Sequence, residues 1–259
     1  ESGAVIRSVW ESLGKPKMIL ACSSCHQSLK QLIPGLETVS LWEMLLKNEA
    51  LGTTRGGCTQ EYKVHDPCTS RYEPDWQHYA RAVIERLGVR YSELPMSRTL
   101  TECCGYGGVA WLANPDLVHK MIQRRINEDN ANYITYCVMC RDLFVSEGKP
   151  TLHLLDFIYG RDISALAIRK PPDYSQRHEN RIRVKQRMEK RLLVKGDWKM
   201  ETYEKINLQL SSEMRDLLEA RLILVEDLQK VIEHAEASGE FFFNKNNGHS
   251  IASFRPNLI

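Results

Sequence analysis

Short β-prone runs alternate with amphipathic stretches over roughly the first 168 residues of the chain. A helix that ends before Gly88 is predicted from apolar residues at helical spacing. These residues are Trp76, Ala80, Val83, Ile84 and Leu87. Strands are predicted at 18–21, 63–66 and 133–136, and further helices at about 24–32, after the Asn114-Pro115 cap and from about Met139. This alternation predicts an α/β layered domain.

The pattern changes after residue 168. Lys170-Pro171-Pro172 interrupts it, and residues 169–195 become rich in Lys and Arg, which predicts a solvated basic linker or helix. Residues 196–259 are predicted to form a smaller, incomplete helical or α+β module. Its apolar helical stripe ends near Gly239, and the turn-like Asn246-Asn247-Gly248 predicts a hairpin. This module offers no recognisable chemistry.

An internal repeat organises the larger domain. Residues 19–29 and 134–144 both contain a predicted strand, a Cys-x-x-Cys pair and the start of a helix, and similar helix starts follow at 40–45 and 151–156. We interpret residues 1–50 as the tail of a first, truncated repeat and residues 51–168 as a complete second repeat. The chain is accordingly expected to be a piece of a longer polypeptide.

Composition narrows the function classes. The formal charge of +2 argues against a nucleic-acid partner, and no run of 18 apolar residues predicts a membrane span. Eight cysteines could build a secreted disulfide scaffold, but the chain is too large for one and opens with no export signal. The adjacent pair Cys103-Cys104 and the two Cys-x-x-Cys pairs favour metal or redox chemistry in the cytoplasm.

Thiolates are soft ligands that select iron–sulfur clusters, zinc or Cu(I). Two adjacent cysteines reach two irons of a cluster more easily than they reach one ion. Glycines after the pair permit positive φ and close backbone approach, so that amides can point at cluster sulfurs: Gly105, Gly107 and Gly108. Cys137 and Cys140 lie where a strand meets a helix, whose N-terminus favours thiolate charge.

Three motifs together resemble the CCG domain: His65-Asp66-Pro67-Cys68, the run from Cys103 to Gly108, and Cys137-Val138-Met139-Cys140. This cysteine-rich domain occurs in heterodisulfide reductase B-type and D-type subunits and in iron–sulfur subunits of lactate, glycolate and glycerol-3-phosphate oxidation systems. The resemblance covers roughly residues 1–165. It implies a non-cubane [4Fe–4S] cluster held by five cysteines: Cys68, Cys103, Cys104, Cys137 and Cys140.

The same resemblance implies function and partners. In the reductases the cluster binds and splits a disulfide, and electrons come from a flavin or ferredoxin-like module or subunit. Three hypotheses remain open for this chain: a thiol/disulfide oxidoreductase subunit, an electron relay without substrate, and an interaction domain stabilised by structural zinc. An open iron site would favour the first, a buried cluster the second, and zinc in anaerobically handled protein the third. No conventional catalytic residues are identifiable.

The other cysteines and two histidines have weaker roles. Cys22 and Cys25 match the closing pair of a preceding repeat and form a possible second, incomplete site. Alternatively, the two cysteines pair with each other, or they bind zinc together with ligands from outside this chain. Cys58, in a Gly56-Gly57-Cys58 turn, is interpreted as a bystander. His65 is expected at a strand end rather than as a ligand, and His26 at a solvated helix position.

Overall fold

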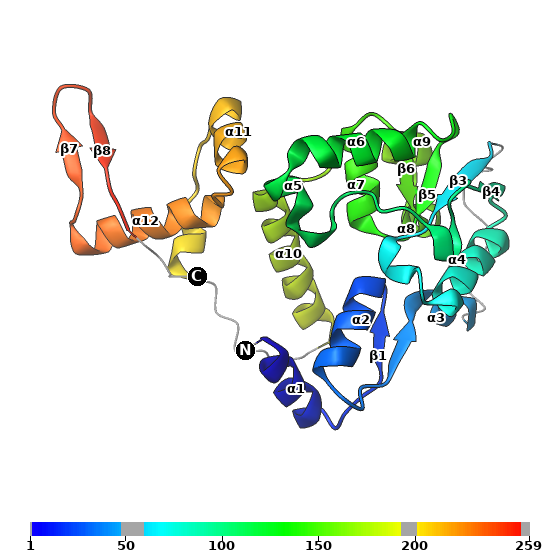
Figure 1. Ribbon diagram of the computed structural model, residues 1–259. Helices are drawn as coiled ribbons and strands as arrows, with labels where there is room; N and C mark the ends of the chain where they lie inside the picture. Colours follow the sequence, from blue (N-terminus) through cyan, green and yellow to red (C-terminus); the bar gives the residue numbers. More distant parts are fainter. Residues whose placement is uncertain (1, 48–59, 193–200, 255–259) are drawn as a thin grey trace. The chain divides into compact units, whose positions relative to one another are not determined.

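The computed structural model describes residues 2–47, 60–192 and 201–254 and divides the chain into two compact units, 1–171 and 172–259 (Figure 1). All eight cysteines fall within the range of the first unit, and Cys58 lies outside the described residues. The expected mixed α/β architecture is confirmed. Among the described residues, no helix combines the length and apolarity that a membrane crossing requires.

A four-stranded parallel sheet forms the centre of the first unit, in the order β4-β3-β5-β6. Its strands are β3 (Tyr62–His65), β4 (Tyr91–Glu93), β5 (Tyr133–Thr135) and β6 (Thr151–His153). Val64 pairs with Ile134, and Ile134 pairs with Leu152; all three are fully buried. Burial on both faces explains the short, continuous apolar runs in the sequence.

Helices cover both faces of this sheet (Figure 1). On one face, α3 (Leu41–Lys47), α4 (Pro74–Arg86), α8 (Leu154–Tyr159) and α9 (Ile163–Ala167) share a core with Val64 and Ile134. On the other, α6 (Pro115–Ile126) and α7 (Val138–Ser146) pack around Tyr133 and Phe144. Residues alternate between these two cores along β5, as the period of a strand requires.

A second, two-stranded parallel sheet lies at the start of the unit. It pairs β1 (Met18–Leu20) with β2 (Thr38–Ser40), and α1 (Ser2–Ser12) and α2 (Ser23–Leu32) accompany it. Trp10, Ile33 and Leu36 form its small buried core. The order strand, helix, strand, helix from β1 to α3 is the same as that from β5 to α8.

The predicted strands and helices of the first unit are confirmed to within a few residues, with one correction. The helix start predicted at 40–45 is confirmed at Leu41, after a strand that ends at Ser40. In the range 151–156, residues 151–153 form a strand instead, and the helix begins at Leu154. Three-residue strands are too short to show a period of two, and here pairing with a parallel neighbour decides the conformation. Strand β4 and helix α1 were not predicted.

The second unit contains α10 (Tyr174–Leu192), α11 (Ser212–Ala220) and α12 (Val225–Ser238), followed by a hairpin of β7 (Phe242–Asn244) and β8 (His249–Ile251). The basic segment is therefore largely helical. Gly239, at φ +72°, ends α12 as predicted, and the predicted hairpin turns through residues 245–248. The second strand of that hairpin begins at His249, directly after the turn.

Candidate metal or cluster site at the carboxyl edge of the sheet

Five cysteines meet at the carboxyl edge of β3 and β5. Because His65 pairs with Thr135, the two strands end level, and the chain following each of them reaches the same edge. Cys68 opens a 3₁₀ turn after β3, and Cys137 is the N-cap of α7 after β5. The adjacent pair Cys103-Cys104 lies in irregular chain between Thr101 and the short turn at Gly107–Val109.

The five thiols form a continuous chain of pairwise contacts. Cys68 contacts Cys103, which contacts Cys104; Cys104 contacts Cys140, which contacts Cys137. Cys104 and Cys140 are buried, whereas Cys68, Cys103 and Cys137 are half-buried. Within the described ranges, no group of three or more His, Cys, Asp or Glu side chains could hold a single metal ion as it stands. The site is thus a row of sulfurs with an inner and an outer side.

Hydrogen bonds concentrate negative charge on Cys103. The thiols of Cys104 and Cys68 donate to its sulfur and lower its pKa strongly; burial opposes this, and the amides of Gly105 and Gly107 add to it. The Gly105 nitrogen is 3.3 Å from the sulfur. Donation to Cys103 correspondingly raises the pKa of Cys68 far above its ordinary value, together with burial. These donors favour the thiolate form of Cys103 over the thiol.

The N-terminus of α7 stabilises a second thiolate. A hydrogen bond from Cys140 lowers the pKa of Cys137 to about 7; burial opposes the shift, and the backbone amides of Cys140 and Met139 assist it. This confirms the predicted position of Cys137 and Cys140 at a strand–helix junction. Cys140 itself has a pKa raised well above its ordinary value, because it donates to both neighbours and is buried.

The glycines after the adjacent pair differ in their roles. Gly105 adopts φ +95°, and an added Cβ would lie 3.0 Å from Cγ1 of Val118, so this turn approaches α6 closely. Gly108 also has positive φ, at +69°. Gly107 does not, which corrects the expectation for that residue; its contribution is the amide directed at Cys103. Positive φ continues instead at Val109, with φ +59°.

The second thiol pair flanks this site on a neighbouring element. Cys22 is the N-cap of α2, and both Cys22 and Cys25 are exposed and in contact with each other. The pKa of Cys25 is raised by burial and by its hydrogen bond with Cys22. Helix α2 packs against the turn that carries Cys68, but the two cysteines are not part of the five-thiol chain of contacts.

His26 corrects the expectation of a solvated position. Its ring is only 7% exposed, accepts or donates a hydrogen bond at 2.9 Å from the Thr38 hydroxyl, and lies 5.3 Å from the Trp76 ring. Burial lowers its pKa, although nearby Glu73 opposes the shift. The ring therefore connects α2 to α4, a helix of the main sheet. The sequence around His26 does not show this contact, because Trp76 is distant in the chain.

His65 lies at the end of β3, as expected, and is fully buried. Burial, with the nearby Arg125 charge, lowers its pKa to about 3, so the ring is neutral at physiological pH. Its Nδ1 accepts a hydrogen bond from Nε of Arg125 at 3.1 Å, which leaves the proton on Nε2.

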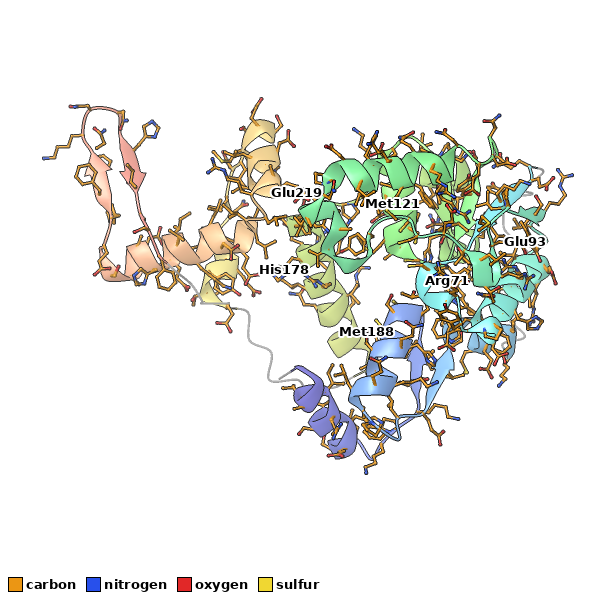
Figure 2. The ribbon with its side chains drawn as sticks, viewed as in Figure 1. Arg71, Glu93, Met121, His178, Met188 and Glu219 are labelled. Carbon is orange, nitrogen blue, oxygen red and sulfur yellow. The ribbon has the colours of Figure 1, made fainter. Side chains whose placement is uncertain are left out.

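Arg71, labelled in Figure 2, donates from the Cys68 turn to the Thr101 carbonyl at 2.5 Å and so joins two cysteine loops.

The donor set fits a thiophilic metal or an iron–sulfur cluster, since it consists of sulfur atoms with backbone amides directed at one of them. Comparison with known proteins agrees. No curated protein and no solved structure matches the chain. The match that is found covers residues 62–142, which include all five cysteines of the site, and this part of the chain is similar to the family described as CCG, cysteine-rich domain.

Proposed function

We propose that this chain is the iron–sulfur subunit or domain of a heterodisulfide reductase-like oxidoreductase. Its ligands would be the five cysteines of the site: Cys68, Cys103, Cys104, Cys137 and Cys140. One observation supports the proposal most: five thiols, brought from three separate loops, touch one another in a single row. A [4Fe–4S] cluster of the non-cubane type is the group that we propose for this row.

Zinc is the second candidate for the native metal. Thiolates suit zinc well, and a structural zinc site would stabilise the same fold. A closed zinc site, however, uses four ligands around one ion, whereas this row offers five, two of them adjacent in sequence. The adjacent pair also differs in depth, because Cys103 is half-buried and Cys104 is buried. Such a set favours several metal atoms over one.

The buried and the half-buried thiols of the site would have different roles toward a bound cluster. The inner thiols, Cys104 and Cys140, would hold its buried side. The outer thiols leave the opposite side accessible to a partner or to a small disulfide. A bound cluster would supply electrons one at a time, and amides directed at Cys103 would tune its reduction potential.

We propose a flavin or ferredoxin-like module or subunit as the electron donor, a small disulfide or thiol as substrate, and the reducing cytoplasm as compartment. A pure electron relay is the alternative role for the same cluster. The Cys22–Cys25 pair would belong to a second site whose other ligands come from elsewhere. Its place on α2, beside the Cys68 turn, would bring the two sites close together.

Metal analysis tests the proposal directly. The protein is purified under strict anaerobiosis, and iron, zinc and acid-labile sulfide are measured per chain, with an EPR spectrum after mild oxidation. About four irons and four sulfides per chain, lost in Cys104→Ser, would support the cluster. Stoichiometric zinc without sulfide, even after anaerobic reconstitution, would overturn it in favour of a structural zinc domain.

A further inference from the structure

A buried carboxylate lies behind the thiol site, where its three loops converge. Asp66 follows the last residue of β3 and is fully buried. Arg81 of α4, itself only 3% exposed, binds it through two parallel hydrogen bonds, Nη1 to Oδ1 at 2.8 Å and Nη2 to Oδ2 at 2.9 Å. This paired geometry compensates the cost of burying the charge and fixes the orientation of the carboxylate.

The same carboxylate is bonded to the other two cysteine loops. The phenol of Tyr136, the residue before Cys137, donates to Oδ1 at 2.7 Å. The backbone amide of Arg98, in the segment that leads to Cys103, donates to Oδ2 at 2.7 Å. The Thr101 hydroxyl in that segment donates to the Asp66 carbonyl, also at 2.7 Å. Asp66 therefore contacts all three chain segments that carry the ligands.

A second contact closes the network on the Cys68 side. The Ser70 hydroxyl lies 2.8 Å from both the Pro67 carbonyl and the Tyr136 hydroxyl. Because Tyr136 donates to Asp66, Ser70 is the donor toward Tyr136, and the turn after Cys68 is tied to the residue before Cys137. Gln77 of α4 donates to the Ser70 carbonyl at 2.8 Å. The side chains of Asp66, Ser70, Gln77, Arg81 and Tyr136 are buried, whereas Arg98, which contributes only its backbone amide, is exposed. A shift of the loops relative to one another would therefore break buried hydrogen bonds.

We propose that Asp66 is the positioning residue of the site: it sets the spacing of the three cysteine loops and, through them, the geometry of whatever metal group they hold. For the iron–sulfur cluster this rests on the proposed function. The role of Asp66 is distinct from that of a ligand, since its oxygens are occupied by Arg81, Tyr136 and Arg98. Substitutions in the network should therefore alter the site while leaving all five thiols in place.

Tyr136→Phe is the most informative variant, because it removes the hydroxyl that bonds to Asp66 and Ser70 and keeps the ring. Tyr133→Phe is its matched control: Tyr133, three residues earlier on β5, is equally buried, but its phenol donates to the Arg125 carbonyl at 2.8 Å rather than to Asp66. Asp66→Asn is the stronger change. Its amide would meet either the Arg98 amide or the Arg81 guanidinium, donor against donor.

The experiment begins with the metal-free chain, titrated with Cd²⁺ and followed by thiolate-to-metal absorption. Tyr136→Phe should weaken Cd²⁺ binding roughly tenfold, and Tyr133→Phe should not, even where both lower the melting temperature equally. The same proteins, reconstituted with iron and sulfide, should differ in EPR spectrum and midpoint potential for Tyr136→Phe alone.

Equal Cd²⁺ affinity in Tyr136→Phe, Asp66→Asn and the parent chain would overturn the positioning role. A parent chain that takes up Cd²⁺ but neither iron nor sulfide would instead contradict the proposed cluster. The cadmium comparison would then still decide the role of Asp66, because it does not depend on the cluster.

Discussion

The Ser23 hydroxyl lies 2.6 Å from the Thr69 hydroxyl, and this contact joins the residue after Cys22 to the residue after Cys68. Gln27, one turn further along α2, donates to the Thr69 carbonyl at 2.7 Å. The N-terminus of the helix that carries the Cys22–Cys25 pair is thereby fixed against the five-thiol site, although neither of its cysteines is part of that row.

Removal of the flanking pair should leave the five-thiol site intact. In the double variant Cys22→Ser/Cys25→Ser, we expect iron and sulfide per chain to equal those of the parent protein, because all five proposed ligands remain. Anaerobic iron and sulfide assays provide the measurement. The matched control is Cys137→Ser/Cys140→Ser, which alters the equivalent motif after β5 and should lose the cluster. A parallel loss in both double variants would place Cys22 and Cys25 among the ligands.

Single substitutions within the adjacent pair should abolish the native cluster. Cys103→Ser removes the sulfur toward which four donors are directed, and Cys104→Ser removes the sulfur that connects Cys103 to Cys140. Iron content and the EPR signal should fall together in each variant. Cys58→Ser serves as the control, with an unchanged spectrum expected; an equal loss there would show that the ligand set is wrong.

The turn after Cys104 should tolerate a methyl group at one glycine and not at another. Gly105→Ala forces positive φ on a residue with a Cβ, at a cost of about 1 to 2 kcal/mol, and brings that carbon against Val118. Gly107→Ala meets nothing within 4 Å and needs no positive φ. We expect a lower melting temperature and reduced iron loading for Gly105→Ala alone. Equal behaviour of the two variants would argue against this strained turn.

The second unit should lose stability in acid through Glu226. Burial raises the pKa of this carboxyl, but the hydrogen bond from Lys230, at 2.5 Å, and the charge of His178 outweigh it, and the pKa lies below the ordinary value. The folded state therefore favours the carboxylate. Its stabilisation is complete above the ordinary glutamate pKa and is lost as pH falls through the lower, folded-state pKa.

Hydrogen exchange of the α12 amides, corrected for the intrinsic pH dependence, measures this effect. Glu226→Gln should reduce protection by about 1 kcal/mol near neutral pH and flatten its decline in acid. Glu236→Gln, a substitution on the same helix outside this ion-pair group, should reproduce the parent profile. A parent profile that stays level in acid would contradict the role assigned to Glu226.

Local signals in the sequence predicted much of the fold and the location of the thiol site. The predicted helix cap at Asn114-Pro115 is confirmed, because the Asn114 side chain accepts a hydrogen bond from the amide of Leu117, only three residues away. Cys137 was placed correctly at a strand–helix junction for a similar reason. Such features depend on neighbouring residues alone, so a single sequence carries them.

The polar support of the site was not predictable in this way. In the sequence, Asp66 stands out only as part of the His65-Asp66-Pro67-Cys68 motif, whereas its carboxylate binds a phenol 70 residues away. The burial of His26 likewise depends on Trp76, which belongs to another helix. Composition and periodicity describe which residues prefer the interior, but they do not say which polar groups will meet there.

The pairing of β3 with β5 also bears on the order in which the protein is made and loaded. Lys63 and Tyr133 are neighbours in the sheet, so a loop of about seventy residues must close before Cys68 and Cys137 can meet. A nascent chain emerging from the ribosome would present its cysteines first singly and then in pairs, and no pair would yet have its partners. Whatever metal group the five thiols hold should therefore enter after the sheet has formed, and folding would be the step that makes the chain competent to receive it.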